Sequence, residues 1–145
     1  MMDQLHNAFH VAFPMQDLQA GKDFYINKLG LQLGRESKHA FIINFFDNQL
    51  VAHRVDTLPE KQDSIYPRHF GLIFADKKSW HALIETAKAN QVSFFREPTC
   101  RFAGEFIEHD SFFLMDPANN LLEFKYYKNS EAIFAAQEFS KVGES

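Results

Sequence analysis

A short motif occurs twice in this chain of 145 residues and constrains the fold more than any other feature. Phe9-His10-Val11-Ala12-Phe13 is echoed by His69-Phe70-Gly71-Leu72, and an aspartate, Asp17 or Asp76, follows each histidine by seven residues. Aspartate is a favoured N-cap residue, and a helix-like segment comes after each one. The sequence therefore predicts one structural unit present in two copies, with a histidine at the same place in both.

The first copy predicts a strand, a helix and three further strands. Alternating bulky and small residues indicate a strand over 8–14, and apolar residues near helical spacing predict a helix over 17–29, ended by Gly30. Shorter apolar runs indicate strands over 31–33, 40–46 and 49–55, with Asp47-Asn48 as a hairpin turn.

The second copy repeats this order. A strand is expected over 66–75 and a helix over 77–89, where four apolar residues follow the i, i+3, i+4, i+7 pattern: Trp80, Leu83, Ile84 and Ala87. Strands are expected over 92–95, 109–115 and 121–127. The segment 96–108 is the longest irregular stretch and is predicted to be a loop, which at that length is often functional.

Together the copies predict an α+β fold of two βαβββ modules. We expect a single domain over 1–128, with modules at 8–55 and 66–127 and a polar linker at 56–65. The tail, 129–145, is expected to hold a short helix over 130–140 capped by Ser130. Sheets with one apolar face pack that face on helices. The more polar faces are therefore predicted to form a paired, curved mixed sheet around a cavity.

Composition excludes several classes of function. The net charge of −4, without a basic block, argues against nucleic acid or an anionic membrane as partner. Cys100 is the only cysteine, which is typical of a reducing compartment. No signal-peptide pattern and no apolar run of about 20 residues is present, so a cytoplasmic protein is expected. The 17 phenylalanines either fill the core or line a cavity for a flat organic ligand.

Strand parity gathers polar side chains on the predicted cavity face, namely His10, His53, His69, Glu123 and Lys125. Two imidazoles and one carboxylate can bind a divalent metal and leave positions open for substrate. His10 and His69 hold matched places in the repeat, so a pseudo-twofold axis would bring them together. A single strand histidine is more often structural, but burying an unpaired Glu123 is costly, which favours a shared metal.

Three further residues are candidates for the cavity. His109 could act as an acid or base, or it could be an edge or surface histidine. Arg101 could bind an anionic group of the substrate, or it could be a solvated loop residue. Val51 lies on the same predicted face as His53, two residues before it.

The order of these motifs resembles the vicinal oxygen chelate superfamily, which includes glyoxalase I, extradiol dioxygenases and bleomycin-resistance proteins. The resemblance covers about residues 8–128. It rests on Phe9-His10-Val11-Ala12, Phe24-Tyr25 with Leu29-Gly30-Leu31, His69-Phe70-Gly71-Leu72, and Asp116-Pro117-Ala118-Asn119-Asn120-Leu121-Leu122-Glu123-Phe124. The last segment resembles the family's DPxGNxxE turn, with Asn119 at the usual glycine, and asparagine tolerates a positive φ.

This resemblance implies metal-ligand roles for His10, His69 and Glu123. It implies Fe(II), Mn(II), Zn(II) or Ni(II) as cofactor, a small-molecule substrate that chelates the metal through two adjacent oxygens, and a homodimer. Glyoxalase I takes a fourth ligand, a glutamate, from the first module. The equivalent residue here is Val51, which cannot bind a metal. His53, two residues on, is left as a fourth ligand under a shifted register or as an acid or base.

A three-ligand set is similar to the dioxygenase pattern, so we expect a metal-dependent enzyme that is most like an extradiol dioxygenase. Two alternatives stay open. One is a glyoxalase-type lyase or isomerase with Zn(II) or Ni(II), in which His53 moves the proton. The other is a non-catalytic drug-binding protein of the bleomycin-resistance kind.

Overall fold

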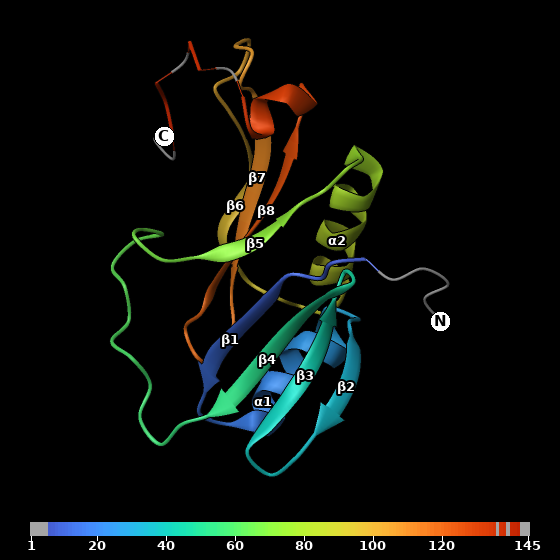
Figure 1. Cartoon of the computed structure of the whole chain (residues 1–145), viewed down its shortest axis with the longest axis vertical. Helices are drawn as coiled ribbons and strands as arrows, with labels where there is room; N and C mark the ends of the chain where they lie inside the picture. The colour runs from blue at the N-terminus through green and yellow to red at the C-terminus, as the bar shows by residue number, and fades with distance from the viewer. Residues whose placement is uncertain (1–5, 136, 139, 143–145) are drawn as a thin grey trace. The chain divides into compact units, whose positions relative to one another are not determined.

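The computed structural model describes residues 6–135, 137–138 and 140–142. The chain divides into two compact units: one runs to Gln62 and includes Asp116–Asn120, and the other comprises Asp63–Met115 and the chain from Leu121 onward. Each unit contains a helix and a four-stranded mixed sheet, labelled in Figure 1. The predicted α+β class and the two βαβββ modules are confirmed.

The first module is a sheet of order β1-β4-β3-β2, in which β1 is parallel to β4 and the other neighbours are antiparallel. Its elements are β1 (His10–Met15), α1 (Leu18–Lys22), a π-helix (Asp23–Lys28), β2 (Gln32–Glu36), β3 (Ala40–Phe45) and β4 (Asn48–Arg54). Its core is formed by buried side chains of the sheet and of the π-helix, among them Met15, Tyr25, Ile43 and Leu50.

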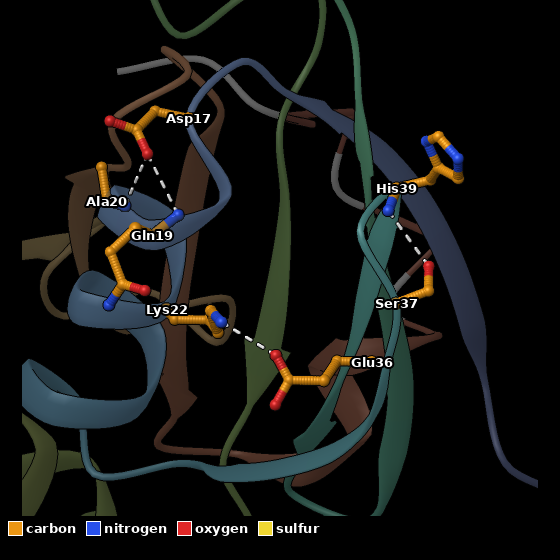
Figure 2. A network of polar contacts seen from close by, with 7 residues as sticks. All are labelled: Asp17, Gln19, Ala20, Lys22, Glu36, Ser37 and His39. Carbon is orange, nitrogen blue, oxygen red and sulfur yellow. Dashed lines mark hydrogen bonds and ion pairs between the residues drawn. The ribbon is translucent and has the colours of Figure 1, made fainter.

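The predicted first helix is present but changes type along its length. Asp17 is its N-cap, and the carboxylate accepts hydrogen bonds from the backbone N–H groups of Gln19 and Ala20 at 3.0 and 3.1 Å (Figure 2). After Lys22 the helix widens, because the N–H of Leu29 donates to the carbonyl of Phe24, five residues back. Gly30, at φ +76°, ends it.

Figure 2 also shows how α1 is fixed beside the second strand. The Lys22 ammonium lies 2.8 Å from the Glu36 carboxylate of β2, and the Ser37 hydroxyl accepts from the N–H of His39 in the following turn. Both partners of the ion pair are partly exposed, so it contributes at most about 1 kcal/mol. Apolar packing is therefore the main support of this module.

The second module is a sheet of order β5-β8-β7-β6, in which β5 is parallel to β8. Its elements are β5 (Phe70–Ile73), α2 (Lys77–Ala89), β6 (Phe94–Arg101), β7 (His109–Met115), β8 (Leu121–Tyr127) and a 3-10 helix (Ser130–Ile133). None of the helices in the described segments is long and apolar enough to cross a bilayer.

The helix α2 begins and ends where the sequence predicts. The Asp76 carboxylate accepts a hydrogen bond from the N–H of Ser79 at 2.7 Å, and all four residues of the predicted apolar stripe are buried. The indole N–H of Trp80 donates to the carbonyl of Phe124 at 2.8 Å. This bond fixes the helix on β8, the strand that carries Glu123.

Three predictions need correction. β5 is shorter than the strand predicted over 66–75, and His69 lies just before it. Pro67 has no backbone N–H to donate to a neighbouring strand, so it is disfavoured inside a strand. β6 continues through much of the predicted loop, so the irregular segment is 102–108. In the tail, the structure has a 3-10 helix that Asn129 precedes as N-cap; residues 136 and 139 of the helix predicted over 130–140 lie outside the described residues.

The turn Asp116–Asn120 belongs to the first unit and adopts the predicted geometry, with Asn119 at φ +65°. The Tyr25 hydroxyl donates to the Asp116 carboxylate at 2.6 Å, and the Asn120 side chain donates to the carbonyl of Pro14 at 3.1 Å. Burial raises the pKa of Tyr25, and the charge of Asp116 raises it further. Tyr25 therefore keeps its proton and remains a donor.

Candidate functional site

One face of the second sheet carries four of the eight predicted site residues, arranged in cross-strand rows. Because side chains alternate along β8, Glu123, Lys125 and Tyr127 share this face. The register places Phe113, Ser111 and His109 of β7 opposite them in turn. β6 adds Thr99 beside Ser111 and Arg101 beside His109. Arg101 reaches this face because it lies on a strand, not in the predicted loop.

A pocket of about 490 Å³ opens on this face, within the second module. Five of the eight predicted site residues line it: His69, Arg101, His109, Glu123 and Lys125. Aromatic side chains, including Phe102 and Tyr127, form much of its apolar wall. The other three, His10, Val51 and His53, lie on the sheet of the first module.

His69 and Glu123 form a directly bonded pair in this pocket. The Nε2 of His69 lies 3.1 Å from Oε1 of Glu123, and its Nδ1 lies 2.7 Å from the carbonyl oxygen of Ile65. A carbonyl only accepts hydrogen bonds, so Nδ1 carries a hydrogen and Nε2 is aimed at the carboxylate. The direct bond from Nε2 then requires a second proton, which makes His69 an imidazolium.

The electrostatics of the pair agree with this geometry. The hydrogen bond to Glu123 raises the pKa of His69. Burial pushes the pKa of Glu123 upward, but the hydrogen bonds from His69 and from the Ser111 hydroxyl, at 2.6 Å, outweigh it and the net shift is downward. Glu123 is therefore an ionised carboxylate held at both oxygens.

His109 is the second histidine of the pocket and differs from His69 in charge. It is only 6% exposed, and its Nδ1 lies 3.1 Å from the carbonyl of Ile107, so Nε2 is the acceptor nitrogen. Burial lowers its pKa, and the neighbouring cations Lys125 and Arg101 add to this effect. At neutral pH His109 is a neutral imidazole that can accept a proton.

Three cations line the same pocket, and each lies over an aromatic ring. The Lys125 ammonium is 5.0 Å from the ring centroid of Tyr127. The Arg101 guanidinium and the Lys141 ammonium lie 5.6 and 5.3 Å from that of Phe102, and Lys141 also pairs with Glu105 at 3.3 Å. Cations over aromatic faces are attracted by the ring quadrupole, which holds them beside the pocket.

The first module repeats the strand register of the second. Ala12 of β1 pairs with Val51 of β4, and Gly71 of β5 pairs with Glu123 of β8. His10 and His69 each lie two residues before the first member of these pairs, so Val51 is the structural counterpart of Glu123 and His53 that of Lys125. The Nδ1 of His10 is bonded to the side-chain oxygen of Gln49 at 2.7 Å.

The donor chemistry of His69 and Glu123 fits two positions of a divalent metal site. A nitrogen of His69 and an oxygen of Glu123 lie side by side, and each side chain is oriented by a second hydrogen bond, to the Ile65 carbonyl or from the Ser111 hydroxyl. Metal ligands in proteins are commonly oriented by such additional hydrogen bonds. Over the residues that the structure describes, no cluster of three or more His, Cys, Asp or Glu side chains is placed to hold a metal.

Sequence reasoning missed several residues that line the pocket or, like Ser111, bond to a residue that lines it. Ser111 could have been found, because it shares the parity of His109 on a strand that is otherwise mostly apolar. For Phe102 and Tyr127, the sequence indicated only that the chain is rich in aromatic residues, without placing either one in the pocket. Lys141 had no signal, because it lies in the tail, fourteen positions after the end of β8, where no periodic pattern places it.

Comparison with known proteins places these features in a family. Residues 8–124 match the model of the Glyoxalase/Bleomycin resistance protein/Dioxygenase superfamily. The crystal structure of a glyoxalase/bleomycin resistance protein/dioxygenase from Alicyclobacillus acidocaldarius is 42% identical, with a TM-score of 0.85, over 92% of this chain and 100% of that one. No curated protein matched the chain.

Two more distant structures share the fold alone. The fosfomycin resistance protein FosX from Listeria monocytogenes is 17% identical, with a TM-score of 0.67, over 89% of this chain and 99% of its own. Lactoylglutathione lyase from Agrobacterium tumefaciens is 18% identical, with a TM-score of 0.62, over 83% and 92%. From the family match and the 42% identical structure, the chain belongs to the glyoxalase/bleomycin resistance protein/dioxygenase superfamily.

Proposed function

We propose that this protein is a metal-dependent enzyme that binds a small substrate through two adjacent oxygens and cleaves its ring in the extradiol manner. The observation that carries the proposal is the oriented His69–Glu123 pair in a pocket of about 490 Å³. Imidazole and carboxylate donors are those that Fe(II), Mn(II), Zn(II) and Ni(II) accept. The proton between the two side chains is what a metal would displace on binding.

We assign the third ligand to His10. It holds the same repeat position as His69, and in both residues Nδ1 is bonded to an oxygen acceptor, which leaves Nε2 as the nitrogen available to a metal. Two histidines and one carboxylate leave open positions for a substrate. Val51 at the counterpart of Glu123 removes the fourth ligand of the glyoxalase pattern.

The remaining pocket residues have roles that follow from their charge. When bound, Fe(II) supplies Lewis acidity toward the two substrate oxygens and the redox chemistry that O₂ requires. Neutral His109 takes the proton from a substrate hydroxyl. Phe102 and Tyr127 exclude water from the ring. In the net reaction, a carbon–carbon bond beside the diol breaks and both atoms of O₂ enter the product, so O₂ is the oxidant.

Oxygen uptake tests this proposal. Protein loaded anaerobically with Fe(II) should consume one O₂ per ring-opened product with at least one member of a catechol panel. Glu123→Gln should lower the rate by about 100-fold or more, since ligand loss costs more than the 10- to 100-fold typical of second-shell changes. Glu97→Gln, at an exposed position of β6, should leave it unchanged. Iron-loaded wild type that consumes no O₂ with any catechol would contradict the reaction.

A binding-only role is the second candidate, favoured by the fact that His69, Glu123 and Ser111 satisfy one another without a metal. In that case chelator-treated protein would bind its ligand as tightly as metal-loaded protein. A glyoxalase-type lyase or isomerase is favoured by the neutral base His109, and it would show turnover with Zn(II) or Ni(II) in the absence of O₂.

A further inference from the structure

The charges around the pocket are strongly unequal. Arg101, Lys125 and Lys141 line it, while Glu123 is the single acidic residue among its described lining. The carboxylate of Glu123 is hydrogen-bonded to His69 and Ser111, and its interaction with Lys125 is coulombic. A pocket with an excess of one charge raises the local concentration of ligands of the opposite charge.

Lys125 is the cation best placed to meet a ligand. In the described part of the chain its ammonium makes no ion pair, and its contact is the ring of Tyr127 at 5.0 Å. Lys141 is instead engaged by Glu105 at 3.3 Å, on the tail that borders the pocket. Lys125 is only partly exposed and is fixed on β8. It can therefore form a charge-assisted hydrogen bond with a ligand at a smaller cost in side-chain entropy than a fully exposed lysine.

The strand register sets the spacing of this cation from the chelating pair. Lys125 follows Glu123 by two residues on the same face, which places their Cα atoms roughly 6–7 Å apart along β8. That is about the length of a benzene ring with its two para substituents. Beyond Lys125, the rings of His109 and Tyr127 pack against each other, with centroids 4.6 Å apart and ring planes 33° apart, and both line the pocket as aromatic surface.

From this placement we propose that the ligand of the pocket is a flat organic anion whose carboxylate or phosphate group binds Lys125. The inference names the substrate class of the proposed function and rests on it for the identity of the pocket. Lys125 becomes the residue that discriminates an anionic ring from its neutral analogue. Carboxylate and phosphate present the same oxyanion chemistry to an ammonium, so a binding experiment is needed to tell which of the two the pocket prefers.

Calorimetric titration of chelator-treated protein tests the proposal. The probes are benzoate, phenyl phosphate and neutral benzyl alcohol. At least one anion should bind wild type about tenfold more tightly than the alcohol, which corresponds to one charge-assisted hydrogen bond. Lys125→Gln should abolish this preference and leave alcohol binding unchanged. Lys78→Gln, which removes the same charge from the exposed face of α2, should retain it. The anion that binds more tightly identifies the oxyanion.

Equal binding of anions and alcohol by wild type would overturn the inference, and so would the absence of detectable binding by all three probes up to about 10 mM, a concentration that allows for very weak complexes. An anion preference that survives in Lys125→Gln would also overturn it. Because these titrations contain no metal, their outcome does not depend on whether the protein binds a metal. Metal binding without anion preference would reject this inference alone, and anion preference without metal binding would reject the metal-dependent reaction alone.

Discussion

Ser111 and His69 divide the two oxygens of Glu123 between them. The serine hydroxyl donates to Oε2 at 2.6 Å from a position that is 1% exposed, and His69 occupies Oε1. Hydrogen bonds to the charged form stabilise a buried carboxylate. The ionised state of Glu123, which a metal ligand needs, therefore depends on a residue that belongs to no recognised motif.

Replacing Ser111 by Ala tests this dependence. We expect Ser111→Ala to lower the free energy of unfolding by about 1–3 kcal/mol, because a buried charged acceptor loses its donor. Apparent metal affinity should fall by about tenfold, since the carboxylate loses its orientation. Urea unfolding and metal titration measure the two effects.

Ser93→Ala is the matched control, because Ser93 is exposed and makes no contact with the pocket. It should change stability by less than about 0.5 kcal/mol. If Ser111→Ala behaves like this control in both measurements, the hydroxyl does not support Glu123.

His109 gives a prediction for pH. Burial lowers the pKa of His109 in the folded protein, whereas in the unfolded chain the imidazole takes up a proton at about pH 6.5. Below about that pH the unfolded state therefore binds more protons than the folded state, and the free energy of unfolding falls. Between pH 8 and 5, wild type should lose more unfolding free energy than His109→Gln. His81→Gln, exposed on α2, should follow wild type. Identical losses in wild type and His109→Gln would contradict the neutral, buried state.

At the scale of single residues, strand parity assigned His10, His53, His69, Glu123 and Lys125 to one predicted face. His69, Glu123 and Lys125 line one pocket of the second module, whereas His10 and His53 lie on the sheet of the first module. Ser111 and Lys141 were missed for different physical reasons. A serine in a strand has no distinctive chemistry until its partner is known, and a tail residue is placed by tertiary packing alone.

At the scale of elements, β6 shows what sequence reasoning could not supply. The segment 96–108, which contains Pro98, was predicted to be an irregular loop, yet β6 continues to Arg101 with register shifts against β7 on both sides of Arg96. β6 is one of the two edge strands of its sheet, and edge strands tolerate proline and bulges. Edge position depends on strand order, which the sequence does not reveal, and it is this strand that carries Arg101.

The pairing of β5 with β8 gives a prediction at this scale. A Cβ added at Gly71 would overlap the backbone of Glu123 on the paired strand, including its carbonyl oxygen. The backbone of a paired strand cannot move aside as a flexible side chain can. Gly71→Ala should therefore cost about 1–3 kcal/mol of unfolding free energy, as overpacking does. Thermal unfolding or urea unfolding measures it.

Gly21→Ala is the control for that substitution. Its added methyl group meets the Met15 side chain at 3.0 Å, and alanine is favoured over glycine in a helix. A cost for Gly71→Ala no larger than for Gly21→Ala would show that β5 does not require close backbone approach beside Glu123.

At the scale of the whole molecule, the repeat was the most informative feature of the sequence. It predicted the fold class, the family resemblance and the register in which Val51 stands where the second module has Glu123. The pairing of the two modules around a common cavity and the homodimer stay predictions. The repeat does not predict the substrate, because several residues that line the pocket lie outside its matched positions, among them Arg101, Phe102 and Lys141.

The metal content of the purified protein tests the central claim most directly. Untagged protein prepared without chelator should contain close to one divalent metal per chain by elemental analysis, as expected for a site with two histidines and one glutamate. Glu123→Gln, in which a ligand is replaced by a neutral amide of the same shape, should contain much less. Wild type with less than about 0.1 metal per chain and no gain on reconstitution would contradict the claim, because a structural pair of His69 and Glu123 would then be the whole of the site.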